Sequence, residues 1–177
     1  SDLCEETNNR LACYNLAKQY HQRGSFEEAI QLYAKAEQIS VAIKLAMENG
    51  LDNEIMSLTN QGSKQVMLKA GSYFEQKGYN EKAIIMYLRG RNFKKALNLS
   101  VRYKLYDFIK RITNEIDVNA DPEDLVAVAE YFIENNQFDE AVHLLVASGN
   151  YDKALDLCVR HNVPINEETI EKILPKQ

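Results

Sequence analysis

The residues of this chain that could do chemistry are three histidines, three cysteines and several paired acids. Cys158 and His161 stand three residues apart, a spacing that puts two zinc ligands on one face of a helix. A structural zinc needs four ligands, and Cys4 and Cys13 are a distant, poorly spaced second pair. We therefore expect neither a metal nor another cofactor. The odd cysteine count fits a reducing compartment, and Cys13 and Cys158 are expected to be buried on apolar helical faces.

Catalytic patterns are also missing from the sequence. No histidine lies in a nucleophile motif, and the residues around Ser72 and Ser148 do not form a nucleophile elbow. Acid pairs such as Glu27 and Glu28 fall at predicted helix starts, where the helix dipole explains them better than general acid–base catalysis does. The sequence therefore predicts a protein that is not an enzyme.

The charge distribution offers one candidate functional surface. Residues 89–111 hold eight basic residues and one acidic residue, whereas residues 112–177 hold four basic and fourteen acidic residues. The basic residues surround Tyr103 and Tyr106 and are the candidate partner-binding set: Arg89, Arg91, Lys94, Lys95, Arg102, Lys104, Lys110 and Arg111. The sequence pI of about 5.3 and the lack of a recognition motif argue against nucleic acid. A membrane surface is disfavoured because the apolar helix faces are needed for stacking. A solvated helix face and a contact for an acidic protein partner stay open.

A long repeat positions these residues. Residues 16–45 align with residues 70–99 and again with residues 128–157, and small, large apolar and turn-forming residues keep their places. Two alanines stand 13 residues apart in each repeat, at positions 29 and 42, 83 and 96, and 141 and 154. The aromatic residues in this register are expected in the core: Tyr20, Tyr33, Phe74, Tyr87, Phe132 and Tyr151. Such a chain is a stack of modules that presents an extended surface rather than one pocket.

The helical periodicity predicts about twelve short helices. They are expected near residues 8–23, 25–36, 39–49, 52–60, 64–77, 80–90, 93–103, 106–115, 122–136, 138–148, 151–161 and 167–174. The predicted fold class is all-α, a right-handed α-solenoid of about six tetratricopeptide-like helical hairpins. We expect residues 1–177 to be a single solenoid fragment with repeat units at about 8–61, 62–119 and 120–174.

Several residues mark where these helices begin and end. Ser25 and Glu28 predict a capping box, and Asp121 predicts a capped helix start with Pro122 at the first helical position. Left-handed helix ends are expected at Gly24, Gly50, Gly78, Asn136 and Gly149. In the second repeat the aromatic residue Tyr79 stands one position early, which predicts an altered hairpin loop there.

These motifs resemble a known family. The segments Ala12–Tyr20, Ala29–Ile30, Ala83–Tyr87 and Tyr131–Cys158 are similar to the tetratricopeptide-like C-terminal region of the 140-kDa-subunit family of intraflagellar transport complex A, a coat-like family of WD40 propellers plus α-solenoid. The resemblance implies a non-enzymatic scaffold that supports retrograde ciliary transport and the import of membrane cargo. It implies other subunits of the complex and ciliary cargo adaptors as partners, and a place in the cytoplasm, the cilium or flagellum and the basal body.

Two other functions are compatible with the same helical repeats. One is a peptide- or cargo-recognition solenoid, and the other is a vesicle-coat solenoid of the clathrin or coatomer kind. No apolar run of about 18 residues suggests a membrane span. The first residues contain neither an initiator Met nor a signal peptide, so we expect an internal fragment of a longer protein.

Overall fold

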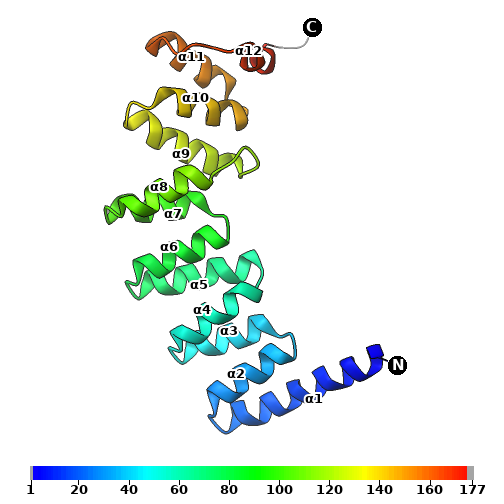
Figure 1. The fold of residues 1–177 in the computed structure, drawn as a ribbon. Helices are drawn as coiled ribbons and strands as arrows, with labels where there is room; N and C mark the ends of the chain where they lie inside the picture. Colours follow the sequence, from blue (N-terminus) through cyan, green and yellow to red (C-terminus); the bar gives the residue numbers. More distant parts are fainter. Residues whose placement is uncertain (1, 175–177) are drawn as a thin grey trace. The chain divides into compact units, whose positions relative to one another are not determined.

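All regular structure in the computed structural model is helical. The structure describes residues 2–174, with side chains from residue 6 onward, and these residues form twelve α-helices and one 3-10 turn without any strand (Figure 1). The all-α class and the twelve predicted helices are confirmed, although the first helix begins at Asp2 instead of near residue 8. The chain divides into two compact units, residues 1–90 and 91–177. This boundary lies inside the second predicted repeat unit, and the division into three repeat units stays a prediction.

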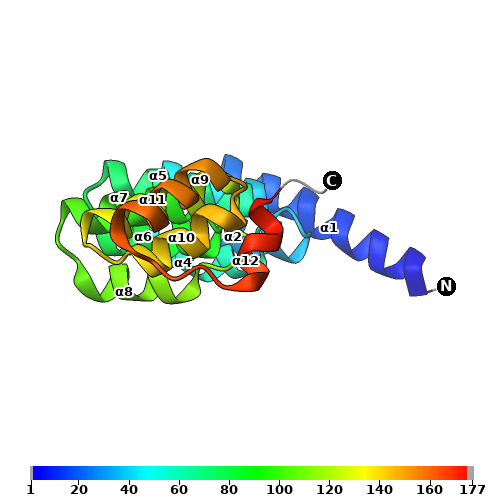
Figure 2. The same ribbon diagram turned by 90° about the horizontal axis from the view of Figure 1, so that it is seen from above.

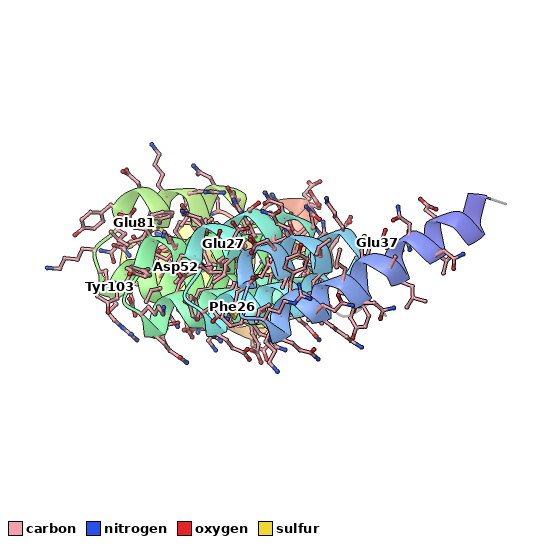
Figure 3. The ribbon with its side chains drawn as sticks, turned by 90° about the horizontal axis from the view of Figure 1, so that it is seen from below. Phe26, Glu27, Glu37, Asp52, Glu81 and Tyr103 are labelled. Carbon is pink, nitrogen blue, oxygen red and sulfur yellow. The ribbon has the colours of Figure 1, made fainter. Side chains whose placement is uncertain are left out.

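The first unit consists of helical hairpins. Its elements are α1 (Asp2–Gln22), α2 (Phe26–Lys35), α3 (Ile39–Glu48), α4 (Asp52–Leu58), the turn η1 (Thr59–Gln61), α5 (Lys64–Gln76) and α6 (Asn80–Arg89). α1 packs on α2, α5 packs on α6, and α3 packs on both α2 and α5. The N-terminal half of α1 extends past α2, as Figure 2 shows. Glu37 lies beside α1 in Figure 3, and its Oε1 is 2.9 Å from Arg10 Nη2.

The second unit follows the same plan. Its elements are α7 (Phe93–Arg102), α8 (Tyr106–Glu115), α9 (Pro122–Glu134), α10 (Phe138–Ala147), α11 (Tyr151–His161) and α12 (Glu167–Ile173). α7 packs on α8 and α9, and α10 packs on α9 and α11. Alanines at the hairpin crossings, Ala96, Ala141 and Ala154, are fully buried, which lets neighbouring helices approach closely.

Left-handed residues end these helices at a constant interval. The described residues with positive φ are Gly24, Glu37, Gly50, Gly78, Arg91, Lys104, Asn136, Gly149 and Asn162. Within each repeat they stand 13 residues apart. Each stands two residues after the last residue of a helix, except Asn162, which directly follows His161. The next amide donates back to the helix, as Ser25 N–H does to the Tyr20 carbonyl at 3.0 Å, which is the Schellman geometry. The four glycines and Asn136 confirm the prediction. The left-handed conformation at Asn162 was not predicted, although asparagine tolerates it, and Glu37, Arg91 and Lys104 are residue types that gave no sign of it.

The helix starts differ from the prediction. Ser25 is the N-cap of α2 but makes no side-chain cap bond, so the predicted capping box is wrong. Ser25 has a ψ of 76°, which differs from the extended backbone of a side-chain cap. Ser63, the N-cap of α5, has that extended backbone, with a ψ of 166°, and its Oγ accepts from Val66 N–H at 3.4 Å. Asp121 likewise makes no side-chain cap bond, although Pro122 does occupy the first turn of α9.

The loop before α6 is not altered by Tyr79, contrary to the prediction. Gly78 has a φ of 79° and Gly24 has a φ of 80°. Tyr79 N–H donates to the Phe74 carbonyl at 2.9 Å, just as Ser25 N–H does in the first hairpin. The backbone is therefore the same, and only the exposed N-cap side chain differs.

Most of the predicted core residues are buried. Tyr33, Phe74, Tyr87 and Phe132 are buried, whereas Tyr20 is half-buried. Tyr151 is 38% exposed, so its assignment to the core is wrong. The reason lies in the tertiary packing. The repeat equivalent of Tyr151 is Phe93 on α7, and α7 is covered by the later helix α9, whereas α11 packs on the preceding helix α10.

The two described cysteine side chains behave differently. Cys158 is buried as predicted. Cys13 is only half-buried, which corrects the prediction, and residues 6–12 before it on α1 are all exposed. The side chain of Cys4, for which no burial is predicted, lies outside the described residues.

Candidate interaction surface

Helix α7 separates an apolar face from a basic face. Its buried residues are Phe93, Ala96, Leu97, Leu99 and Ser100. Its exposed residues are Lys94, Lys95, Asn98, Val101 and Arg102. The exposed positions recur every three or four residues, so they lie on one helical face. We call this face, together with Tyr103, Lys104 and Tyr106 of the following loop and helix start, the α7 surface.

The loop after α7 adds aromatic residues to this surface. Tyr103 is 48% exposed and Tyr106 is 69% exposed. Lys104 stands between them with a φ of 55°, and Leu105 N–H closes the corner on the Ser100 carbonyl at 2.8 Å. Exposed tyrosines beside cations can contact a protein partner through both ring and hydroxyl.

Three of the eight predicted basic residues are engaged within their own unit. Arg89, on α6 of the first unit, donates to Thr59 Oγ1 at 3.3 Å. Arg91 Nη2 lies 3.4 Å from Asp117 Oδ1, and its guanidinium stands 5.2 Å from the Phe93 ring centre. Arg111 Nε lies 2.6 Å from Glu115 Oε1. These residues serve the fold, so the structure does not bring all eight into one free surface.

The remaining basic residues are directed to solvent. Lys94, Lys95, Arg102 and Lys104 are exposed on the α7 surface, and Lys110 is exposed on α8. Among the described residues, no carboxylate lies within 4.0 Å of the charged groups of Lys94, Arg102, Lys104 or Lys110. The open positive charge of the stretch is therefore concentrated along α7 and its C-terminal loop.

One acidic residue of α9 binds the N-terminal end of α7. The Oδ1 atom of Asp124 accepts from Lys94 N–H at 2.9 Å, while Asn92 Oδ1 accepts from Lys95 N–H at 3.0 Å. Two free amides of the first turn of α7 are thus satisfied, one of them from a different helix. The sequence placed Asp124 at the start of its own helix and gave no sign of this contact.

Burial is the main influence on the Asp124 carboxyl group. Asp124 is only 5% exposed. Burial, as the largest cause, raises the pKa of Asp124 above its ordinary value, while the hydrogen bond from Lys94 N–H lowers it and Asp121 raises it again. The backbone bonds stabilise the carboxylate without removing the cost of burying it.

The structure gives no metal geometry to Cys158 and His161. Burial, with Asp139 as a smaller cause, raises the pKa of the Cys158 thiol, and the His161 ring stacks on Phe138 at 3.6 Å between ring centres. Within the described part of the chain, no three His, Cys, Asp or Glu side chains are grouped as metal ligands would be. None of the helices searched in that part is long and apolar enough to cross a membrane.

Comparison with known proteins agrees with the helical repeats. The model of the tetratricopeptide (TPR) domain of intraflagellar transport proteins 140 and 172 matches residues 1–177, the whole chain. WD repeat-containing protein 35 of Mus musculus is 24% identical over 147 residues, which cover 78% of this chain and 12% of that protein. The chain thus spans about an eighth of the length of this relative. The match over all residues, together with the all-α hairpin fold, shows that this chain belongs to the family of TPR domains of intraflagellar transport proteins 140 and 172.

Proposed function

We propose that this chain is a protein-binding scaffold segment of an intraflagellar transport complex A subunit. The observation that carries the proposal is the family match over residues 1–177, on a fold made of stacked hairpins. Repeats of this kind act by presenting extended surfaces to partners. The family match also favours intraflagellar transport over a vesicle coat.

The partners we propose are the other subunits of the complex and ciliary cargo adaptors. The process would be retrograde transport, with import of membrane cargo into the cilium, and the location would be the cytoplasm, the cilium or flagellum and the basal body. Sequence relatives of this family support that assignment, and no membrane or nucleic acid contact is included in it.

The contact surface that we propose is the α7 surface, with an acidic partner. Lys94, Arg102 and Lys104 present open positive charge, while Val101 and Tyr103 add exposed apolar area beside it. Charge of one sign around apolar groups favours both the rate and the specificity of binding to an oppositely charged partner.

The test is capture of partners from a lysate of ciliated cells, at low and high salt, with mass spectrometry as the readout. We expect the other complex subunits to be enriched by the wild-type chain. Lys94→Glu, Arg102→Glu and Lys104→Glu together should reduce this capture, and salt should weaken it because exposed charges are screened.

A matched control carries the same charge change elsewhere. Lys18, Arg23 and Lys35 are exposed in the first unit, and their triple reversal to Glu should leave capture intact. Circular dichroism should show unchanged helicity in both triple variants. Equal capture by both variants at low salt would contradict the role of the α7 surface, and capture of coat proteins without the complex would contradict the assignment to this transport system.

A further inference from the structure

A groove of about 640 Å³ opens on the first unit between α3 and α5, next to the C-terminal end of α1. Its apolar lining includes Val41, Met47 and Val66. Its charged lining includes Lys44 on α3 and Lys69 on α5, both exposed. The volume is large enough for a few side chains of a bound segment, and the combination of apolar wall and charge at the rim is typical of binding sites.

In the second unit, a buried carboxylate binds the start of the equivalent helix. The pair α7–α9 corresponds to the pair α3–α5, because Ser40 aligns with Lys94 and Val66 aligns with Asp124. At α7 the second helical amide, that of Lys94, is bound by the buried Asp124 carboxylate. The chain itself thus shows what chemistry fits the start of this kind of helix.

The first unit supplies no such acid. α5 begins with Ser63, Gln65 and Val66, whereas the equivalent positions of α9 are all acidic: Asp121, Glu123 and Asp124. Gln38, the N-cap of α3, makes no side-chain cap bond. Ser40, the equivalent of Lys94, lines the groove. The helix start, Lys44 and Lys69 therefore contribute positive potential to a groove whose α5 wall is uncharged apart from Lys69.

Glu48 is the acidic member of the lining, and it does not reverse this balance. Its Oε1 stands 4.0 Å from Lys44 Nζ, and both side chains are more than half exposed. Such an exposed pair is weak, and it lies at the C-terminal end of α3, away from Ser40. The start of the groove therefore keeps its positive character.

We propose that the α3–α5 groove binds a short acidic–apolar segment of a partner protein, whose carboxylate lies beside Val66 at the start of α3, as the Asp124 carboxylate lies at the start of α7. Lys44 and Lys69 would pair with the acidic residues, and Val41, Met47 and Val66 would contact the apolar residues that follow. The occupant is not a second copy of this chain, because the acidic turn of α9 is already held on its own α7. This groove is separate from the α7 surface and does not depend on it.

The chain provides its own probe. A peptide of residues 119–129, with blocked termini, carries the three acidic residues and the apolar residues of α9. We would titrate it into the isotope-labelled 177-residue chain and follow backbone amide shifts by NMR. We expect shifts centred on Ser40, Val41 and Lys69. A peptide with the three acids changed to Asn, Gln and Asn should bind at least tenfold more weakly.

Charge reversal completes the test. Lys44→Glu with Lys69→Glu should weaken binding at least tenfold. Lys35→Glu with Lys110→Glu, exposed lysines outside the groove, should leave it unchanged. The proposal is overturned if the acidic peptide produces no shifts in the groove at millimolar concentration, if the amide peptide binds equally well, or if the groove variant binds like wild type. Shifts confined to α7 or α9 would also overturn it.

Discussion

Tyr87 of α6 packs closely against α5. A β-carbon added at Gly71 would lie 2.6 Å from Tyr87 Cε1, so the ring packs directly on the backbone of α5. The Tyr87 hydroxyl donates to Glu75 Oε2 at 2.5 Å. Burial, followed by this hydrogen bond, raises the pKa of Tyr87 to about 12. The folded state therefore holds the phenolic proton more tightly, and this contribution to stability is lost as the pH rises from 10 towards 12.

In the other repeats the residues equivalent to Gly71, Glu75 and Tyr87 are all different or adapted together. In the first repeat the aligned residues are Ala17, His21 and Tyr33, and the Tyr33 hydroxyl lies 3.4 Å from His21 Nδ1. In the third repeat the aligned residues are Ala129, Ile133 and Leu145, which need no polar partner. The polar partner is thus present where the tyrosine is present, because a buried hydroxyl needs a hydrogen bond.

Gly71→Ala should lower the free energy of unfolding by about 1–3 kcal/mol, because the new methyl group overlaps the Tyr87 ring. In an open helix the same change would stabilise by about 1 kcal/mol. Adding Tyr87→Leu, the residue of the third repeat, should recover part of the loss. Urea unfolding of the two single variants and the double variant measures this, and a neutral Gly71→Ala would show that the ring does not pack as described.

Asp124→Ala should destabilise the chain by about 1–3 kcal/mol, because Lys94 N–H loses its buried acceptor. Asp124→Asn keeps an acceptor and removes the buried charge. Since the pKa of Asp124 is raised, the wild-type carboxyl favours folding most below its unfolded pKa of 3.8 and less as the pH rises through the folded pKa. The stability of Asp124→Asn relative to wild type should therefore increase with pH above 3.8.

The control for this prediction is Glu134→Gln, which changes an exposed acid at the other end of the same helix. Its stability relative to wild type should depend less on pH. A constant difference between Asp124→Asn and wild type from acid to neutral pH would contradict the burial of a titrating group at this position. Urea unfolding at several pH values gives both curves.

At the scale of elements, a left-handed residue recurs every 13 residues between the short helices of each repeat. A helix of ten residues and a three-residue corner with one left-handed residue fill this period, as α6 and α7 show. Glycine adopts the left-handed conformation at little cost, whereas Lys104 and Arg91 do so against steric resistance. The corner at Lys104 is therefore imposed by the packing of α7 on α8 and not by residue type alone.

Lys104→Gly should stabilise the second unit by roughly 1 kcal/mol, because it relieves the left-handed strain at an exposed site. Gly78→Ala should cost about 1 kcal/mol or more for the reverse reason, since a β-carbon there would meet nothing within 4 Å and the effect is conformational. Thermal unfolding measures both changes. Lys110→Gly, inside α8, serves as the control and should destabilise by about 1 kcal/mol.

At the scale of the whole molecule, helices contact their neighbours in sequence. The main helix–helix contacts within each compact unit join adjacent or next-adjacent helices, as in α1–α2, α3–α5 and α7–α9. Stability in such arrays is close to a sum of local and neighbour contributions. A defect in one unit should therefore affect that unit more than the other.

Ile112 and Ile30 allow this to be tested, because both are fully buried, one in each unit. Ile112→Ala should cost about 2–5 kcal/mol and should lower amide hydrogen-exchange protection mainly in residues 91–177. Ile30→Ala should do so mainly in residues 1–90. Mass spectrometry of exchanged peptides gives the map. An equal loss over both units for either variant would show that the chain unfolds as one cooperative block.

The candidate site was predicted in part. The position of the cations could be read from the sequence, because charged residues at three- and four-residue spacing on an amphipathic helix lie on its solvent face. The engagement of Arg91 with Asp117 and of Arg89 with Thr59 could not, because each joins residues more than twenty positions apart. The α3–α5 groove was likewise not visible in the sequence, since its lining comes from three helices.

The sequence by itself determined the helices, their hairpin order and most of the left-handed corners. These depend on interactions within a few residues, so periodicity, glycine and asparagine are enough to specify them. Only the tertiary structure decided that Asp124 binds the start of α7, that Tyr151 is exposed while Phe93 is buried, and that the corners at Arg91 and Lys104 are left-handed. These outcomes depend on which helix packs against which, so equivalent aromatic residues are buried in one repeat and exposed in another.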